Sequence, residues 1–485
     1  MIRPRRHCVR GAVGTFVLVG GVLNAACGPG PESGDVVGPV VNDRRTVEVP
    51  KPPRLVIVYV LDALRADHVG GRGWTPVIDE LSAEGVSFSN HTSTAASTMT
   101  WAKTFFSGRF FLQRGGLPPE VETVAEVMRT AGFRTVGISG NGNVSEKYGL
   151  ARGFDTFEMV YPLARRADPA TYVNRNAADI HRRALELLGE RPADTPTFMY
   201  LHAVHPHSPY APPRDLAGEL CGEIPSSIDG MSPTMVAIRD GELPTTEADR
   251  ARLACLYAAG LRYSDTEIGH LMAELDRRYP LGEVLLIVTS DHGEEFFDHG
   301  GVLHGHTLYD ELLRIPLIFH WPGRLGPLVV QAESDTVDFH ETLRALVGAP
   351  YSSAEAGGRS LWPAILGADA TAVPPKVRFA SVPTLPGGMV AVRSRRHKLI
   401  FAPRTDGGPG MGLGLGRSHD REYLFDLQTD PGESRNLIGR GLNEEESLRR
   451  TLVEWIERNT LKGKVEEVEL DRETREHLEA LGYVQ

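Results

Sequence analysis

Residues able to bind a metal ion follow two apolar segments that lie far apart in this sequence. Leu55 to Leu61 is an unbroken run of apolar and β-branched residues and ends at Asp62. Residues 285–288 form a second such run, and Asp291 and His292 follow shortly after it. Runs of this kind predict buried strands, and open α/β sheets bind ligands at the carboxyl ends of their strands. In a parallel sheet Asp62, Asp291 and His292 would therefore meet at one edge and hold a divalent cation.

The segment after His292 contains further histidines at 299, 304 and 306. Its glycines argue against a helix, so these side chains are expected on a loop. A carboxylate set that includes imidazole favours Mn²⁺ or Zn²⁺ and also admits Ca²⁺. The alternative, a polar loop with solvated histidines, fits a single Asp–His pair equally well. A second strand that ends in an aspartate, Asp62, favours the metal site.

A hydroxyl-rich segment lies between these two predicted strands. It runs from Ser93 to Trp101 and leads into the residues 102–108. A serine or threonine at a helix N-terminus usually caps the helix. Alternatively, one of these hydroxyls is a nucleophile: metal coordination would lower its pKa, and the helix end would hold an anionic substrate. The residues themselves leave both interpretations open.

Polar side chains follow two more predicted strands. The strand at 135–138 leads into a turn at 140–143 that ends in Asn143, and the strand at 197–202 ends in His202. His205 and His207 come directly after it. These residues become candidates for the same site if the strands belong to the same sheet.

Strands and helices alternate along residues 54–375. Helical spacing of apolar residues predicts helices at 123–131, 177–188 and 253–275, the first opened by a capping box from Thr123 to Glu126. This alternation predicts an α/β fold with a doubly wound, mostly parallel sheet flanked by helices. Residues 376–485 predict a small C-terminal α+β subdomain, with short strands at 389–392, 398–401 and 423–426 and a helix around 448–456.

The N-terminus predicts export. Four arginines precede an apolar run at 12–23, and small residues follow it, which is the layout of a signal peptide over residues 1–26. Cys27 follows directly, so lipidation there competes with plain secretion or an uncleaved anchor. Residues 27–53 are rich in Gly, Pro and Val and predict a flexible tether. We expect a periplasmic or membrane-anchored protein with a possible lipid anchor at Cys27.

The net charge limits the classes of binding partner, and the cysteine content indicates a disulfide. The 485 residues carry a formal charge of −11, which argues against a nucleic-acid-binding protein but leaves small anionic substrates open. Four cysteines are present. With Cys8 in the signal peptide and Cys27 at its end, Cys221 and Cys255 remain as a pair that an oxidising compartment would join in a disulfide. The segment 216–247 between predicted elements is an insertion that could shape specificity.

An ordered series of motifs resembles the sulfatase family of the alkaline phosphatase superfamily over residues 54–485. The series consists of residues 60–68, 98–109, 207–213, 289–294, 304–316, 423–433 and 478–483. The resemblance implies that Asp62, Asp291 and His292 bind the metal and that Thr98 is both the nucleophile and a further ligand. It also implies that His207 and His306 hold the oxygens of the transferred group or protonate the leaving group, with Asn143 a weaker candidate. His202, His205, His299 and His304 are expected at a greater distance.

The sequence departs from the family at the nucleophile. Sulfatases carry Cys-x-Pro-x-Arg or its serine equivalent, whose first residue becomes formylglycine, and here residues 98–102 read Thr-Met-Thr-Trp-Ala. Threonine cannot become that aldehyde, and the paired aspartates of the family are reduced to Asp62-Ala63. We therefore expect a metal-dependent hydrolase of phosphate, phosphodiester or phosphonate esters without formylglycine. Sulfate ester hydrolysis, phospho-head-group transfer and a lipid-tethered binding protein with a decayed site remain the alternatives.

Overall fold

The computed structural model describes residues 48–481, apart from residues 114, 162–175, 193, 223, 225, 353–356, 368–373, 384–387, 403–421 and 460–469. The predicted signal peptide, Cys27 and most of the predicted tether lie outside these residues. Within the described part of the chain, no helix combines the length and the apolar character needed to cross a membrane.

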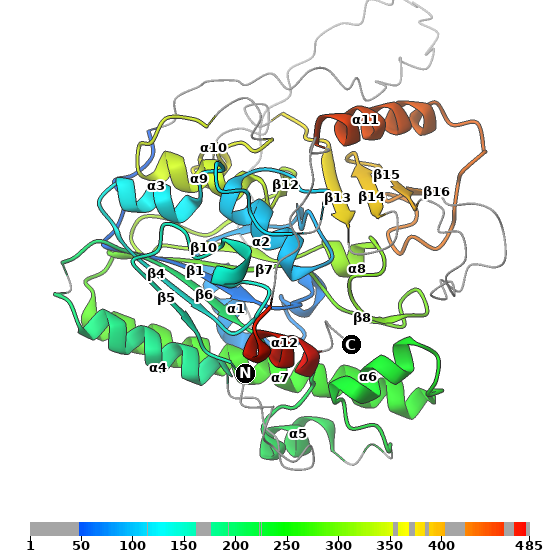
Figure 1. Ribbon diagram of the computed structural model, residues 1–485, viewed down its shortest axis with the longest axis horizontal. Helices are drawn as coiled ribbons and strands as arrows, with labels where there is room; N and C mark the ends of the chain where they lie inside the picture. Colours follow the sequence, from blue (N-terminus) through cyan, green and yellow to red (C-terminus); the bar gives the residue numbers. More distant parts are fainter. Residues whose placement is uncertain are drawn as a thin grey trace, which may run out of the picture. The chain divides into compact units, whose positions relative to one another are not determined.

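An eight-stranded, mostly parallel sheet forms the centre of the fold (Figure 1). Its strand order is β11-β2-β10-β7-β1-β6-β4-β5. The strands β7, β1, β6, β4 and β5 are parallel, β10 is antiparallel to both β7 and β2, and β11 is parallel to β2. Their bounds are Leu55–Leu61 (β1), Val86–Phe88 (β2), Arg134–Ser139 (β4), Thr156–Met159 (β5), Thr197–Ala203 (β6), Val284–Ser290 (β7), Leu317–His320 (β10) and Leu328–Val330 (β11).

Helices cover both faces of this sheet, as the sequence predicts. Alternate residues of β1 enter two separate cores: Val56, Val58 and Val60 face one, and Leu55, Ile57 and Tyr59 face the other. The first core is closed by α2 (Thr98–Ser107), α3 (Val124–Thr130), α9 (Asp338–Leu346) and α10 (Trp362–Ile365). The second is closed by α1 (Pro76–Glu84), α4 (Asn176–Gly189) and α7 (Glu247–Arg278). Figure 1 shows the two layers above and below the sheet.

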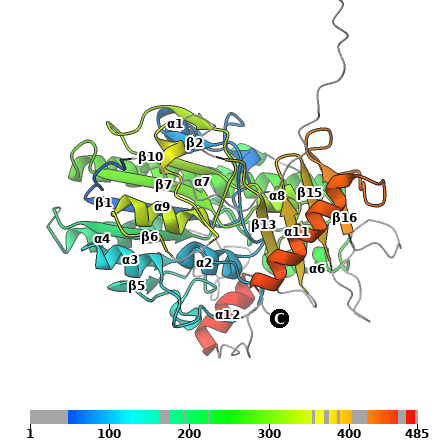
Figure 2. The ribbon, with the colours of Figure 1, turned by 90° about the horizontal axis from the view of Figure 1, so that it is seen from above.

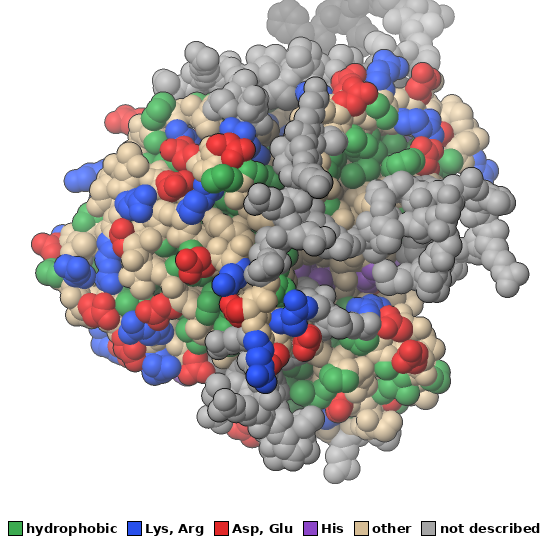
Figure 3. Space-filling model, in the orientation of Figure 1, with side chains coloured by type: hydrophobic (Ala, Val, Ile, Leu, Met, Phe, Trp, Pro, Cys, Tyr) green, Lys and Arg blue, Asp and Glu red, His purple; other side chains and the backbone are tan. Residues whose placement is uncertain are grey.

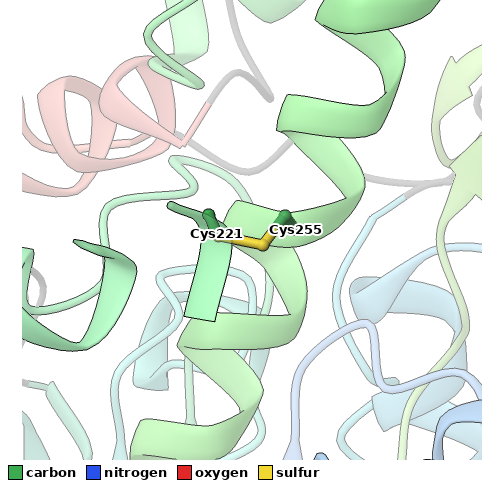
Figure 4. Close-up of a disulfide and its surroundings, with 2 residues drawn as sticks. All are labelled: Cys221 and Cys255. Atoms are coloured by element: carbon green, nitrogen blue, oxygen red, sulfur yellow. A yellow bond between two sulfur atoms is a disulfide. The ribbon is translucent and has the colours of Figure 1, made fainter. Parts of the chain in front are cut away.

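The long helix α7 begins at Glu247, earlier than the apolar pattern predicts, because Thr246 and Asp249 form a capping box there. Two short helices of the insertion, α5 (Arg214–Cys221) and α6 (Ser232–Arg239), lie before it in the chain. The predicted disulfide is present: Cys221 at the end of α5 is joined to Cys255 on α7, with their Cα atoms 5.7 Å apart (Figure 4). It fastens the insertion to the helix that packs under the sheet.

A separate four-stranded antiparallel sheet forms the C-terminal part. It consists of β13 (Arg378–Val382), β14 (Met389–Arg393), β15 (His397–Phe401) and β16 (Glu422–Asp426), in that order. Helix α11 (Asn443–Asn459) lies across this sheet and buries Leu448, Leu452 and Trp455 against it (Figure 2). The remaining elements are β3 (His91–Thr92), β8 (Glu295–Phe296), β9 (Val302–Leu303), α8 (Asp310–Leu313), β12 (Ser334–Asp335), α12 (Arg472–Ala480) and the 3-10 turns Ala66–His68 and Glu146–Tyr148.

A buried ionic cluster joins the small sheet to the main domain. We call it the junction cluster; it consists of Asp310, Arg393, Lys398 and Glu433. Lys398 Nζ lies 2.9 Å from Asp310 Oδ1 and 2.7 Å from Glu433 Oε1, and Arg393 also pairs with Asp310. Asp310 stands at the start of α8, whereas Lys398 and Arg393 come from the small sheet. The two parts are thus held together by opposite charges as well as by apolar contacts.

Candidate active site

The parallel pairing of β1 with β7 brings the three predicted metal ligands together. Leu61 pairs with Ser290, so Asp62 and Asp291 are the next residues of two neighbouring strands at the same sheet edge. One ligand atom each of Asp62, Asp291 and His292 lies within 4.8 Å of the others. All three side chains are fully buried. The site therefore depends on strand register, which fixes the spacing of residues more than two hundred positions apart.

Each carboxylate has one oxygen held by the protein. Asp62 Oδ2 accepts a hydrogen bond from Asn141 Nδ2 (2.6 Å), and Asp291 Oδ1 accepts from the backbone N–H groups of Ala63 (3.0 Å) and His292 (2.9 Å). The other oxygens, Asp62 Oδ1 and Asp291 Oδ2, are buried and have no hydrogen-bond partner among the described residues, although His292 Nε2 lies 3.8 and 3.3 Å from them. Buried charged oxygens require a partner, so the arrangement fits a divalent cation.

The electrostatics of the site favour an ionised Asp62. Burial by itself would raise the pKa of Asp62, but attraction to His207, His202 and His292 outweighs burial and holds that pKa well below its usual range. His292 shows the reciprocal effect: burial lowers its pKa, and the stronger attraction of Asp291 and Asp62 raises it. An ionised Asp62 favours the binding of a cation at neutral pH.

Thr98 is the first residue of α2 and lies beside the three ligands. Its Oγ1 is 3.3 Å from His292 Nε2 and 3.5 Å from Asn141 Nδ2. The N-cap position belongs to Ser97, not to Thr98. The capping alternative therefore does not describe the Thr98 hydroxyl, which faces the predicted metal ligands at the positive end of a helix.

Asn141 is a contact of the site that the sequence reasoning missed. It follows the end of β4 by two residues, and its amide contacts both Asp62 and Thr98. The candidate chosen from the sequence, Asn143, lies two residues further; its backbone N–H donates to Asn141 Oδ1 (2.9 Å). The signal that singled out Asp62, a polar residue just past a buried strand, applies equally to Asn141.

His207 and His202 reach the site from the strand end of β6. The His207 ring lies 6.5 Å from the His292 ring, and its backbone N–H donates to the Asp62 carbonyl (3.2 Å). His207 Nδ1 bonds to the carbonyl of Ser208, which can only accept, so this nitrogen carries the proton. His202 Nε2 lies 3.5 Å from Asp62 Oδ2. The structure thus places His202 beside a predicted ligand, whereas the sequence predicts a greater distance.

His304 also contacts the site more closely than the sequence reasoning expects. Its ring centroid is 4.1 Å from that of His292 and 4.8 Å from that of His207. Its Nδ1 lies 3.0 Å from Glu294 Oε1, a fully buried carboxyl whose pKa burial raises to about 7. Burial, with His292 and His207 nearby, holds the pKa of His304 well below its usual value.

His306, which the resemblance favours, forms an ion pair with Glu295 (2.7 Å), and this attraction outweighs burial and raises the pKa of His306. His205 packs against Tyr263, with ring centroids 5.4 Å apart. His299 stacks on Tyr309 at 3.6 Å and bonds to Glu311 (2.7 Å), next to the junction cluster. On the face shown in Figure 3, histidine side chains reach the surface between the small sheet and α6.

Comparison with known proteins agrees with this geometry. The profile of the Sulfatase family matches residues 54–349. Human arylsulfatase A is 24% identical over 461 residues, covering 81% of this chain and 84% of its own length. Choline-sulfatase of Rhizobium meliloti is 27% identical over 248 residues, covering 48% of this chain and 44% of its own.

Solved structures share the fold. A protein in complex with its substrate D-glucosamine-2-N,6-O-disulfate superimposes with a TM-score of 0.67 at 18% identity, covering 84% of this chain and 98% of that one. A phosphonate monoester hydrolase from Silicibacter pomeroyi superimposes with a TM-score of 0.61 at 20% identity, covering 85% and 96%. With the family profile spanning more than half of the sequence and the ligand set assembled at one sheet edge, the chain belongs to the sulfatase family and is an ester hydrolase.

Proposed function

We propose that this protein is a metal-dependent hydrolase of phosphorus esters, either phosphate mono- or diesters or phosphonate esters, and that unmodified Thr98 is its nucleophile. The observation that carries the proposal is the position of Thr98 Oγ1, 3.3 Å from His292 Nε2 and at the N-terminus of α2. A hydroxyl in that position is close to the predicted cation and to backbone N–H groups that favour an anion.

The chain's own residues supply the steps. Thr98 Oγ1 gives up its proton and attacks phosphorus, the bond from phosphorus to the leaving oxygen breaks, and the leaving group takes a proton and departs as the alcohol. The product of this step is a phosphate or phosphonate ester of Thr98. Water then loses a proton and attacks the same phosphorus, the bond from phosphorus to Thr98 Oγ1 breaks, and Thr98 regains a proton as the phosphorus acid is released. When bound to Asp62, Asp291 and His292, a divalent cation lowers the pKa of the attacking hydroxyl and neutralises charge on the transferred group.

Two imidazoles are positioned to hold the substrate oxygens. His207 and His304 lie side by side, 4.8 Å apart, on the side of His292. Glu294 orients His304 through the bond to its Nδ1, so the opposite nitrogen faces away from Glu294. Asn141 keeps Asp62 in place and contacts the nucleophile. We assign substrate contacts to His207 and His304 and a lesser part to His306.

Threonine at position 98 favours phosphorus over sulfur. The threonine Cβ carries one hydroxyl and a methyl group, so an intermediate on Oγ1 must be opened by a nucleophile, water or an acceptor alcohol, that attacks the transferred phosphorus or sulfur. Phosphonate monoester hydrolases among the structural neighbours support this substrate class. Sulfate ester hydrolysis is the second candidate, and the curated relatives arylsulfatase A and choline-sulfatase favour it.

The test is hydrolysis of matched nitrophenyl phosphate, phosphodiester, phosphonate and sulfate esters by the mature domain, with Mn²⁺, Zn²⁺ or Ca²⁺ added. We expect turnover of a phosphorus ester that falls by at least about 10³-fold in Thr98→Ala. Thr98→Ser should keep part of the activity, and Thr100→Ala, on the same helix, is the matched control.

Other outcomes point elsewhere. Dominant sulfate turnover would overturn the phosphoryl proposal. Turnover that appears only when an acceptor alcohol is added would indicate a transferase. Bound metal without turnover of any ester would favour a binding protein.

We also propose that the protein is exported and carries a lipid on Cys27. The Cys221–Cys255 disulfide supports an oxidising compartment. Labelled palmitate should be incorporated into the full-length chain in a bacterial host and lost in Cys27→Ala. Recovery of an unlabelled protein in the periplasm would contradict lipidation and leave plain secretion.

A further inference from the structure

A strained residue directly follows the first metal ligand. Ala63 has a φ of +63°, a region that residues with a side chain rarely adopt, and it is fully buried. Such conformations persist only where the surrounding structure holds them, and they are concentrated at functional sites. The contacts of Ala63 therefore show what this strain accomplishes.

Both polar backbone groups of Ala63 are engaged. Its N–H donates to Asp291 Oδ1 (3.0 Å), so it fixes the carboxylate of a predicted metal ligand. Its carbonyl accepts from the hydroxyl of Tyr257 (2.8 Å). The same hydroxyl accepts from the N–H of Arg65 (3.0 Å). The Tyr257 hydroxyl thus contacts the backbone of the residues before and after Leu64, and these two hydrogen bonds hold the turn that contains Ala63.

Tyr257 is itself held rigidly. It lies on α7, fully buried, with its ring 4.9 Å from Phe296 and edge-on to His68 at 5.1 Å. Two residues before it, Cys255 carries the disulfide to α5. Burial also raises the pKa of Tyr257, so the hydroxyl keeps the proton that it donates to Ala63. A fixed donor on a long helix can impose a backbone conformation that the turn alone would not adopt.

We infer that Tyr257 is a positioning residue for the metal site: its hydroxyl holds Ala63 in the left-handed conformation, and Ala63 in turn aims the Asp291 carboxylate. The inference rests on the proposed metal site and names a residue outside the ligand set. A tyrosine that only fills the core would have the same ring contacts, but its hydroxyl would not determine how well the cation binds.

The experiment measures Mn²⁺ binding to the metal-free protein by calorimetry, without any substrate. Tyr257→Phe keeps the ring and removes the bridge, and we expect the Kd for Mn²⁺ to rise by about 10- to 100-fold, the usual range for groups that support a ligand. Glycine adopts positive φ without strain. Ala63→Gly combined with Tyr257→Phe should therefore recover most of the lost affinity.

The matched control is Tyr279→Phe, at a buried tyrosine directly after the last residue of α7, which should leave the Kd unchanged. An unchanged Kd in Tyr257→Phe, or a loss that Ala63→Gly does not recover, would overturn the inference. If Tyr257→Phe does not fold, Ala63→Gly alone still tests it: affinity equal to or above the wild type supports the inference, and a tenfold loss contradicts it. Wild-type protein that binds no Mn²⁺, Zn²⁺ or Ca²⁺ would instead refute the proposed function.

Discussion

Two buried acidic clusters in this protein have the same kinds of carboxylate and opposite surroundings. In the junction cluster, Asp310 and Glu433 are paired with Lys398 at 2.9 and 2.7 Å, and Asp310 is also paired with Arg393. In the candidate active site, the charged group nearest to Asp62 Oδ1 and Asp291 Oδ2 is the imidazole of His292, whose Nε2 lies 3.8 and 3.3 Å from them. One cluster contains its own cations, and the other has imidazoles and amides around its acids.

The charges that surround buried acids distinguish a structural cluster from a ligand site. A buried carboxylate that stays ionised requires compensating charge. Where the chain supplies a lysine, the cluster joins two parts of the fold and needs nothing from solution. Where the described residues supply imidazoles and amides but no lysine or arginine beside the acids, we expect an external cation to complete the site. The following predictions test this contrast.

The largest expected effect is at Asp291. Asp291→Asn removes the charge and keeps an oxygen that can accept from Ala63 and His292, so we expect activity to fall by about 10⁴-fold. The Kd for Mn²⁺ should rise by more than the roughly 100-fold seen for groups behind a ligand. Because the substitution removes both the repulsion between Asp291 and Asp62 and the attraction between Asp291 and His292, the metal-free protein should lose less stability to urea than a junction variant does. A stability loss comparable to that of a junction variant would break the contrast.

Lys398→Met should give the opposite pattern. It leaves Asp310 and Glu433 buried without their lysine, and we expect the free energy of unfolding to fall by about 3–5 kcal/mol in urea titrations. The Kd for Mn²⁺ should not change, because the cluster lies outside the ligand set. A weakened Mn²⁺ affinity in folded protein would show that the two clusters are coupled.

The stability of the protein should depend on pH through the junction cluster. Burial raises the pKa of Glu433 to about 7, with Asp310 adding to the effect, above the value expected in the unfolded chain. The native state thus binds the proton more tightly, so this stability is fully present below about pH 4.5 and is lost as the pH rises through about 7.

Urea unfolding at pH 5 and pH 7 measures this change in the free energy of unfolding. Glu433→Gln should reduce the difference between the two pH values. A residual difference of the same sign should remain, since burial also raises the pKa of Glu294 to about 7. An unchanged difference in Glu433→Gln would mean that Glu433 titrates normally in the folded protein.

The smallest effect is expected at Asn141. Asn141→Ala removes the hydrogen bond to Asp62 Oδ2, and activity should fall by about 10-fold, as for other groups that orient a ligand. Asn143→Ala is the paired variant, and its effect should be smaller because its contact with Asn141 is through the backbone N–H, which the substitution keeps. A larger loss in Asn143→Ala would restore the candidate chosen from the sequence. Kinetics with the best nitrophenyl ester measure both.

Local signals in the sequence predict the fold class and the candidate metal ligands. Apolar runs such as Leu55–Leu61 are buried on both faces, and the prediction of a mostly parallel sheet flanked by helices is confirmed. Because parallel strands end at a common edge, Asp62 and Asp291 could be brought together without any knowledge of the helices. The cysteine pair was likewise predictable, since few cysteines remained to be joined.

Only the tertiary structure decided which of several similar residues enter the site. Histidines 304 and 306 are two positions apart in a glycine-rich segment, and the sequence does not show which ring faces His292. His306 forms an ion pair with Glu295, whereas His304 contacts Glu294, which orients its ring toward the site. Asn141 and Tyr257 depend on contacts across 79 and 194 residues. Side-chain direction and long-range contacts follow from packing, and no local pattern of residue types records them.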